Sequence, residues 1–130
     1  MELAKEKLQA ELKLLNQATQ TLKIALGEPM TEIVRDAVIQ RFEYCFELSW
    51  KAIQTAARYM GTADCNSPRE CVKAAYKMNW IENPDAWFEA MEARNKTSHT
   101  YNAKLAMEVY NVAKKFPLLM ENLSGQLQKI

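Results

Sequence analysis

The chain has few of the residues that build turns, and it lacks the long apolar runs that span membranes. Its 130 residues include 3 glycines and 4 prolines, which favours long helices joined by few turns. No apolar run approaches the roughly 20 residues that a membrane-spanning helix needs. Residues 1–7 alternate in charge and contain no apolar region of the kind found in secretory signals. We therefore expect a cytoplasmic protein with no membrane partner.

Cysteine and histidine are also scarce. The chain has three cysteines, Cys45, Cys65 and Cys71, and one histidine, His99. The number of cysteines is odd, no two form a C-x-x-C pair, and one histidine cannot complete a zinc site of ordinary spacing. We therefore predict no metal site and no cofactor, with Cys45 in the core and Cys65 and Cys71 without a role.

The net charge of +1 argues against a protein that binds nucleic acid mainly through long-range attraction to the phosphate backbone. Any contact with RNA would have to use a local basic patch, for which the candidates are Arg69, Lys73, Lys77, Arg94, Lys96 and Lys104. With 48% apolar residues, the chain can bury a substantial core. We expect a single domain over residues 1–130.

Apolar residues recur at helical spacing from the start of the chain. Leucines three and four residues apart predict a helix over residues 3–26, with Gly27 as a left-handed cap. A second helix is predicted from Thr31, as N-cap, to Gly61, as C-terminal glycine. Its apolar face is wider than one neighbouring helix can cover. This helix is therefore either the centre of the bundle or part of a contact with another subunit.

The second half of the chain carries clear signals for helix starts. Ser67-Pro68-Arg69-Glu70 combines the residues of a capping box with a first-turn proline, and predicts a short helix over residues 68–79. Asn83-Pro84 repeats the signal. A last helix over residues 102–127 begins at Asn102, and we expect Pro117 to kink it without ending it. Nothing in the chain predicts a strand, so the fold class is all-α.

The most informative segment runs from Arg94 to Tyr101 and places Arg94, His99 and Tyr101 within eight positions. These side chains supply an anion-binding guanidinium, an imidazole that can titrate near neutral pH, and a phenol hydroxyl. Residues five apart on a helix point roughly 140° away from each other. If Arg94 and His99 act together, the helix must therefore end near residues 97–98. From spacing alone, the cluster could equally be a structural hydrogen-bond network or an exposed turn.

This segment resembles the Arg-x4-His-x-Tyr motif of HEPN domains. The stretch Arg41-Phe42-Glu43-Tyr44-Cys45-Phe46-Glu47-Leu48-Ser49-Trp50-Lys51 is similar to the second-helix signature of one HEPN branch, the nucleotidyltransferase substrate-binding proteins. The two proline-marked helix starts also fall in the order typical of that branch. The resemblance covers nearly the whole chain. It implies a four-helix up-and-down bundle with an additional short helix.

The resemblance also implies a function. Related proteins are homodimeric, metal-independent ribonucleases that a minimal nucleotidyltransferase, encoded nearby, silences by transferring AMP to the motif tyrosine. On this chain, Arg94 and His99 would be catalytic, Arg94, Asn95 and Lys96 would bind phosphate or nucleotide, and Tyr101 would be modified. One histidine per chain independently favours a dimer, because cleavage through the RNA 2′-hydroxyl usually needs both a base and an acid.

Other residues and other functions stay open at this point. Glu43 and Glu47 could support Arg94, or they could be solvated charges. The tryptophans are expected in the core or at a dimer surface. The chain could also be a non-catalytic subunit that binds nucleotide through the same cleft, or a helical dimer whose motif is purely structural.

Overall fold

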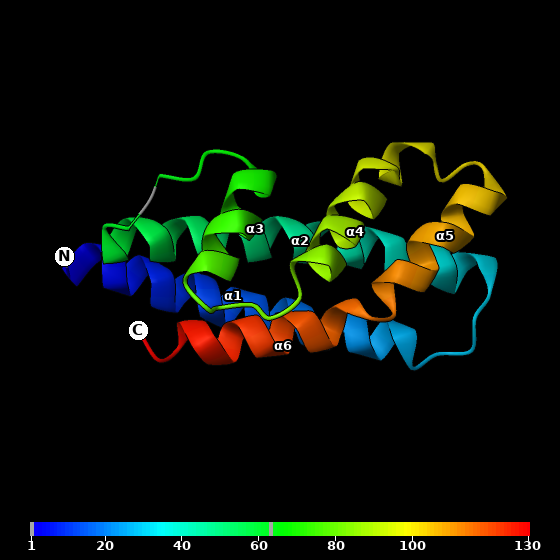
Figure 1. The fold of residues 1–130 in the computed structure, drawn as a ribbon. Coiled ribbons are helices and arrows are strands. Elements are labelled where there is room, and N and C mark those ends of the chain that lie inside the picture. Colours follow the sequence, from blue (N-terminus) through cyan, green and yellow to red (C-terminus); the bar gives the residue numbers. More distant parts are fainter. Residues whose placement is uncertain (1, 63) are drawn as a thin grey trace.

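The computed structural model describes residues 2–62 and 64–130, and all of the regular structure in these residues is helical (Figure 1). In chain order the elements are α1 (Glu2–Leu26), α2 (Glu32–Met60), α3 (Pro68–Lys77), α4 (Pro84–Asn95), the 3-10 helix η1 (Thr97–His99), α5 (Ala103–Ala113) and α6 (Phe116–Leu127). The predicted all-α fold class is confirmed. No helix in the described part of the chain is both long enough and apolar enough to cross a membrane.

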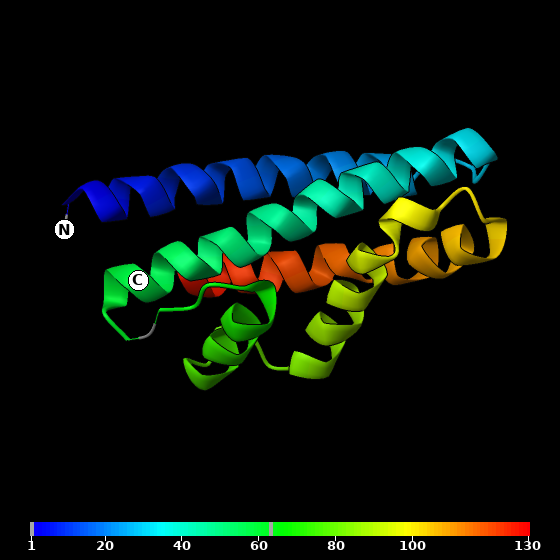
Figure 2. The same ribbon diagram turned by 90° about the horizontal axis from the view of Figure 1, so that it is seen from above.

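The helices form an up-and-down bundle with an extra short helix. Figures 1 and 2 show α1 and α2 side by side and antiparallel, with α6 returning along α1. The third side of the bundle is formed by α5 followed by α6 (Figure 2), the fourth position is taken by α4, and α3 is the additional short helix. Both chain ends therefore lie at one end of the bundle (Figure 1), while the junction between α4 and α5 lies at the other end.

The central element is α2, which contacts the five other α-helices and η1. This position agrees with the explanation of its wide apolar face as that of the central helix of the bundle. At the centre of the core, the ring of Phe116 lies 5.2 Å from the rings of Phe42 and Trp87 and 6.0 Å from that of Phe46. All four rings are buried, and each contributes about 1.5–3 kcal/mol to folding. This cluster joins α2, α4 and α6.

Local hydrogen bonds set most helix ends where the sequence predicts them. The Thr31 hydroxyl accepts from the amide of Val34 at 3.1 Å, and Ser67, Asn83 and Asn102 cap their helices in the same manner. Gly61 has the expected left-handed conformation, with φ of 67°. The prediction for Gly27 was wrong: α1 does end at Leu26, but Gly27 keeps a negative φ and its amide donates to Lys23.

The last helix is divided, contrary to the prediction of a continuous kinked helix. The α-helical pattern lapses at Lys114 and Lys115, and α6 begins at Phe116 with Pro117 in its first turn. Pro117 has no amide to donate to the carbonyl of Ala113. The amide of Lys115 instead bonds the Val112 carbonyl at 3.1 Å, which is a tighter 3-10-type contact. The apolar spacing continues across this break, so spacing alone cannot reveal it.

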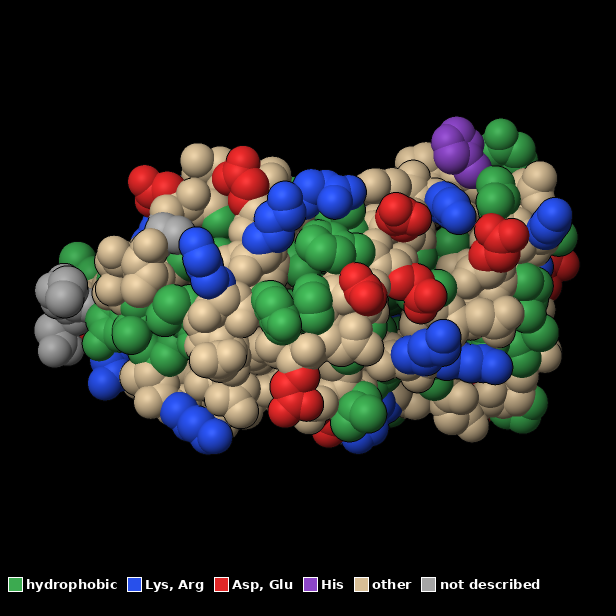
Figure 3. Space-filling view, viewed as in Figure 1, with side chains coloured by type: hydrophobic (Ala, Val, Ile, Leu, Met, Phe, Trp, Pro, Cys, Tyr) green, Lys and Arg blue, Asp and Glu red, His purple; other side chains and the backbone are tan. Residues whose placement is uncertain are grey.

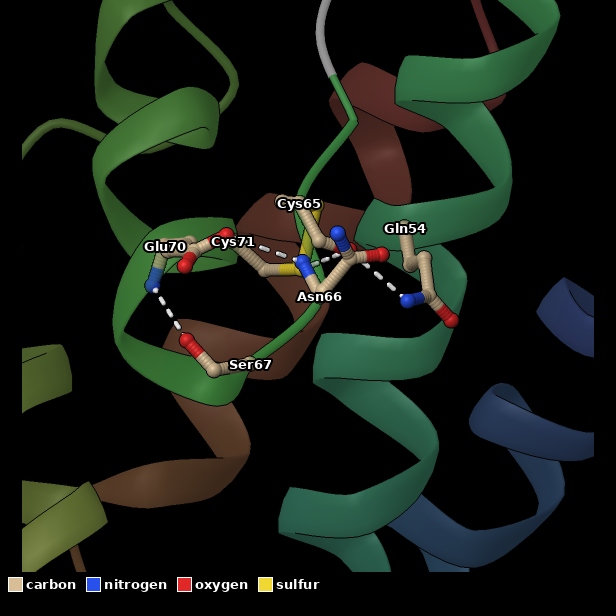
Figure 4. Close-up of a disulfide and its surroundings, with 6 residues drawn as sticks. All are labelled: Gln54, Cys65, Asn66, Ser67, Glu70 and Cys71. Carbon is tan, nitrogen blue, oxygen red and sulfur yellow. Dashed lines mark hydrogen bonds between the residues drawn. A yellow bond between two sulfur atoms is a disulfide. The ribbon is translucent and has the colours of Figure 1, made fainter.

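The prediction for two of the cysteines was also wrong, because Cys65 and Cys71 form a disulfide (Figure 4). Ser67 caps α3, and the first turn of that helix brings Cys71 back to Cys65, with a Cα–Cα distance of 5.0 Å. Gln54 of α2 donates to the carbonyl of Cys65 at 2.7 Å. The disulfide therefore links the first turn of α3 to the segment before it, and Gln54 holds this segment against α2. Cys45 is buried, as predicted.

Candidate functional site

The motif lies at the junction between α4 and α5, where the sequence predicted a helix end. After α4 the chain makes the short turn η1, and the Thr97 hydroxyl donates to the carbonyl of Arg94 at 2.8 Å. Thr100 repeats this bond to Thr97 at 3.1 Å. Asn102 then opens α5 by accepting from the amides of Lys104 and Leu105. The polar residues thus end one helix and start the next within a few positions.

Arg94, on the last turn of α4, is half-buried and held on three sides. Its Nε donates to Glu47 Oε1 at 2.6 Å, and one terminal nitrogen bonds the same oxygen. Its other terminal nitrogen donates to Asn95 Oδ1 at 3.1 Å. The guanidinium carbon lies 5.7 Å from the centre of the Phe46 ring, which is within the range of a cation–π contact.

Glu47 is therefore the carboxylate that contacts Arg94, and Glu43 is exposed on the same helix. The second oxygen of Glu47, Oε2, accepts from the indole of Trp50 at 3.0 Å. Sequence reasoning placed Trp50 only in the core or at an interface and missed this bond. The spacing of three residues on α2 was the available signal, since such residues are neighbours on a helix surface. Trp80 and Trp87 are buried, as expected for core residues.

Two N–H groups of Arg94 have no hydrogen-bond partner among the residues that the structure describes. A guanidinium has five N–H groups, and three of those of Arg94 are used by Glu47 and Asn95. The remaining two belong to the terminal nitrogens, and 28% of the side chain is exposed. Arg94 thus has an open edge with donors fixed in direction.

His99 and Tyr101 lie just beyond Arg94 on exposed chain. Tyr101 is 87% exposed, and its ring centre is 6.2 Å from that of His99 in an edge-to-face arrangement. Figure 3 shows the histidine projecting from the surface at one end of the molecule. Asn95 and Lys96 are exposed as well, and the Lys96 ammonium lies 3.7 Å from Glu108 of α5.

The charges of the motif are nearly balanced within one chain. Arg94 faces Glu47, and Lys96 faces Glu108. A groove of about 460 Å³ between α4 and α5 has Lys96 and Glu108 in its wall, whereas Arg94, His99 and Tyr101 lie outside its lining. On the face drawn in Figure 3, basic side chains alternate with acidic ones and form no single basic patch. One copy of the chain thus presents an ordered cluster of charges that is close to neutral.

Comparison with known proteins identifies the family. The family model described as nucleotidyltransferase substrate binding protein like matches residues 4–129. The chain belongs to this family. The match runs from the first turn of α1 to beyond the end of α6 and therefore covers the whole bundle. The resemblance to HEPN proteins of the substrate-binding branch is thereby confirmed.

Two relatives illustrate the family. A protein of Haemophilus influenzae described as probable ribonuclease HepT is 30% identical over 105 residues, which cover 75% of this chain and 72% of the relative. A crystal structure of a protein from Thermus thermophilus has a TM-score of 0.82 at 32% identity and covers 88% of this chain and 98% of that one.

A further solved structure, also from Haemophilus influenzae, is described as revealing the fold of a substrate binding domain of a nucleotidyltransferase. It has a TM-score of 0.79, covers 90% of this chain and 98% of that chain, and is 24% identical. At this identity the likeness supports the fold alone.

Proposed function

We propose that the protein is the HEPN partner of a minimal nucleotidyltransferase in a two-protein toxin–antitoxin-type system, and that it is a latent, metal-independent endoribonuclease. One observation carries the proposal: an oriented Arg94 with two open N–H groups is followed at once by the exposed side chains of His99 and Tyr101. The similarity to a probable ribonuclease supports it.

In this proposal Arg94 holds the scissile phosphate through its open edge, and Asn95 and Lys96 add polar contacts from the same turn. His99 removes the proton from the 2′-hydroxyl or protonates the leaving 5′-oxygen. Histidine suits either role because its charge can change near neutral pH.

The active form is proposed to be a homodimer. One chain supplies a single histidine, whereas the reaction needs both a base and an acid. One chain also balances its motif charges with Glu47 and Glu108. Two motifs facing each other across a two-fold axis would supply the second histidine and a second guanidinium to the same phosphate.

Tyr101 is the proposed site of silencing. Its 87% exposure makes the hydroxyl reachable by another enzyme. AMP transfer would join the phenol oxygen to the α-phosphate of ATP and release pyrophosphate. The product would carry a negative charge and an adenosine close to His99, whose ring lies 6.2 Å away. Both the charge and the bulk would exclude an RNA phosphate.

The test combines cleavage with modification. The protein should cut RNA in the presence of a chelator, and Arg94→Ala and His99→Ala should abolish cutting with little change in melting temperature. Incubation with the neighbouring nucleotidyltransferase, ATP and magnesium should add AMP to the peptide that contains Tyr101. Tyr101→Phe should prevent this addition. Tyr76→Phe, which changes an exposed tyrosine of α3, is the matched control and should remain a substrate.

A second candidate function is a non-catalytic subunit that binds nucleotide for the nucleotidyltransferase. The balanced charges around Arg94 favour it, as does the family's description as substrate-binding proteins. Tight nucleotide binding without RNA cleavage, in a protein that gains no AMP, would select this function over the ribonuclease.

A further inference from the structure

The two oxygens of the Glu47 carboxylate bind different side chains. One oxygen receives both hydrogen bonds from Arg94, and the other receives the indole N–H of Trp50 at 3.0 Å. Arginine and carboxylate commonly pair through two parallel bonds that use both oxygens. Here the second oxygen is bonded to the indole, and Arg94 bonds the first oxygen alone.

We infer that Trp50 is a positioning residue for Arg94 and that it acts through Glu47. The inference rests on the proposed function, in which Arg94 holds the phosphate. Without the indole donor, the free oxygen of Glu47 would turn to the guanidinium and form the two-oxygen pair. Both carboxylate oxygens would then lie against the guanidinium of Arg94. The guanidinium would rotate, and its two unused N–H groups would point in a different direction.

The position of Trp50 suits this task. Its side chain packs against the core, one turn along α2 from Glu47, so the ring has a fixed direction. Phe46, buried on the same helix, supports the guanidinium from its face. One short segment of α2 thus supplies the carboxylate, the ring that carries Arg94 and the donor that fixes the carboxylate. Arg94 itself comes from α4, so its orientation depends on α2 at every contact except that with Asn95.

The inference can be tested with inorganic phosphate as the probe. The Nε–H resonance of Arg94 is followed in ¹H–¹⁵N spectra of the whole protein during a phosphate titration. Trp50→Phe should shift this resonance before phosphate is added and should weaken phosphate binding about five- to ten-fold, the effect of one hydrogen bond of ordinary strength. Trp80→Phe makes the same change beside the start of α4, at the opposite end of that helix, and should leave both readouts as in the wild type.

A double-mutant cycle then separates action through Glu47 from a general packing effect. In the Glu47→Gln background, Trp50→Phe should change phosphate affinity less than about two-fold. An equal loss with and without Glu47→Gln would overturn the inference, as would an unshifted Arg94 resonance in Trp50→Phe. If Trp50→Phe does not fold, Glu47→Gln alone decides: it should move the indole N–H resonance of Trp50, and an unmoved resonance would refute the contact.

These outcomes are independent of RNA cleavage. A wild-type protein that cuts no RNA would remove the proposed ribonuclease function but would leave the coupling between Trp50 and Arg94 measurable. If it does cut RNA, Trp50→Phe should lower kcat in step with phosphate affinity while the melting temperature changes little.

Discussion

Removing the Cys65–Cys71 disulfide should destabilise the protein by an amount that depends on the length of the loop between the two cysteines. The two residues are six apart in sequence, and for so short a loop the loss of chain entropy in the unfolded state gives about 2.4 kcal/mol. With the usual unfolding entropy per residue, this corresponds to a fall in melting temperature of about 9 °C. The effect should be a change in stability and not a loss of fold, because the core cluster around Phe116 does not include either cysteine.

The measurement is urea unfolding of the wild type and of Cys65→Ala/Cys71→Ala, each with and without a thiol reductant. Reductant should lower the unfolding free energy of the wild type by about 2.4 kcal/mol and leave the double variant unchanged. Cys45→Ala is the control for a thiol outside the disulfide. Its free energy should respond to reductant as that of the wild type does.

Figure 4 shows why the reduced protein should keep α3 in place. The Ser67 hydroxyl still caps the helix, and the carboxylate of Glu70 accepts from the amide of Asn66 at 3.0 Å. Gln54 still holds the carbonyl of Cys65. A wild type that is insensitive to reductant, or a reduced form that loses most of its helical signal, would refute this reasoning.

Three further predictions concern stability. Burial raises the pKa of the Cys45 thiol to about 12 from an ordinary value of 9.0. As pH rises, the thiol therefore ionises in the unfolded state before it ionises in the folded state. The unfolding free energy of the wild type should fall relative to that of Cys45→Ala as pH rises from about 9 toward 12. Gly61→Ala should lower the unfolding free energy by about 1 kcal/mol because residue 61 has a φ of 67°. Gly125→Ala, on the open surface of α6, should raise it by about 0.5–1 kcal/mol. Denaturant unfolding of both variants tests this contrast. Asn102→Ala should lose about 1 kcal/mol of cap energy and Asn102→Ser much less, in the same assay.

Helix ends were predictable from the sequence where a few neighbouring residues determine them. A side-chain cap needs only its own residue and an amide two or three positions later, so Thr31 and Asn102 could be assigned without knowing the fold. The end of α4 was predicted in a similar way, since threonine and serine bond to nearby backbone more readily than they extend a helix.

Features that depend on the path of the chain in space could not be predicted. The pairing of Cys65 with Cys71 requires the turn into α3, and neither their number nor their spacing indicates it. The spacing on α2 permits a bond between Trp50 and Glu47, but it could not show that the other oxygen of Glu47 binds Arg94, which comes from α4. In both cases the sequence analysis identified the residues, but packing of the helices determines which partners they contact.

The chemistry of the motif follows from its place between two helix ends. The C-terminus of a helix carries a partial negative charge and is a poor site for an anion, whereas the N-terminus favours one. Arg94 stands at the unfavourable end of α4, and Glu47 adds a full negative charge beside it. The favourable end, that of α5, already gives two of its amides to Asn102. A phosphate at this junction must therefore gain its attraction from added positive charge, and a second copy of the motif would supply a second Arg94 and a second Lys96. This requirement is a further physical reason for proposing that the active form is a dimer.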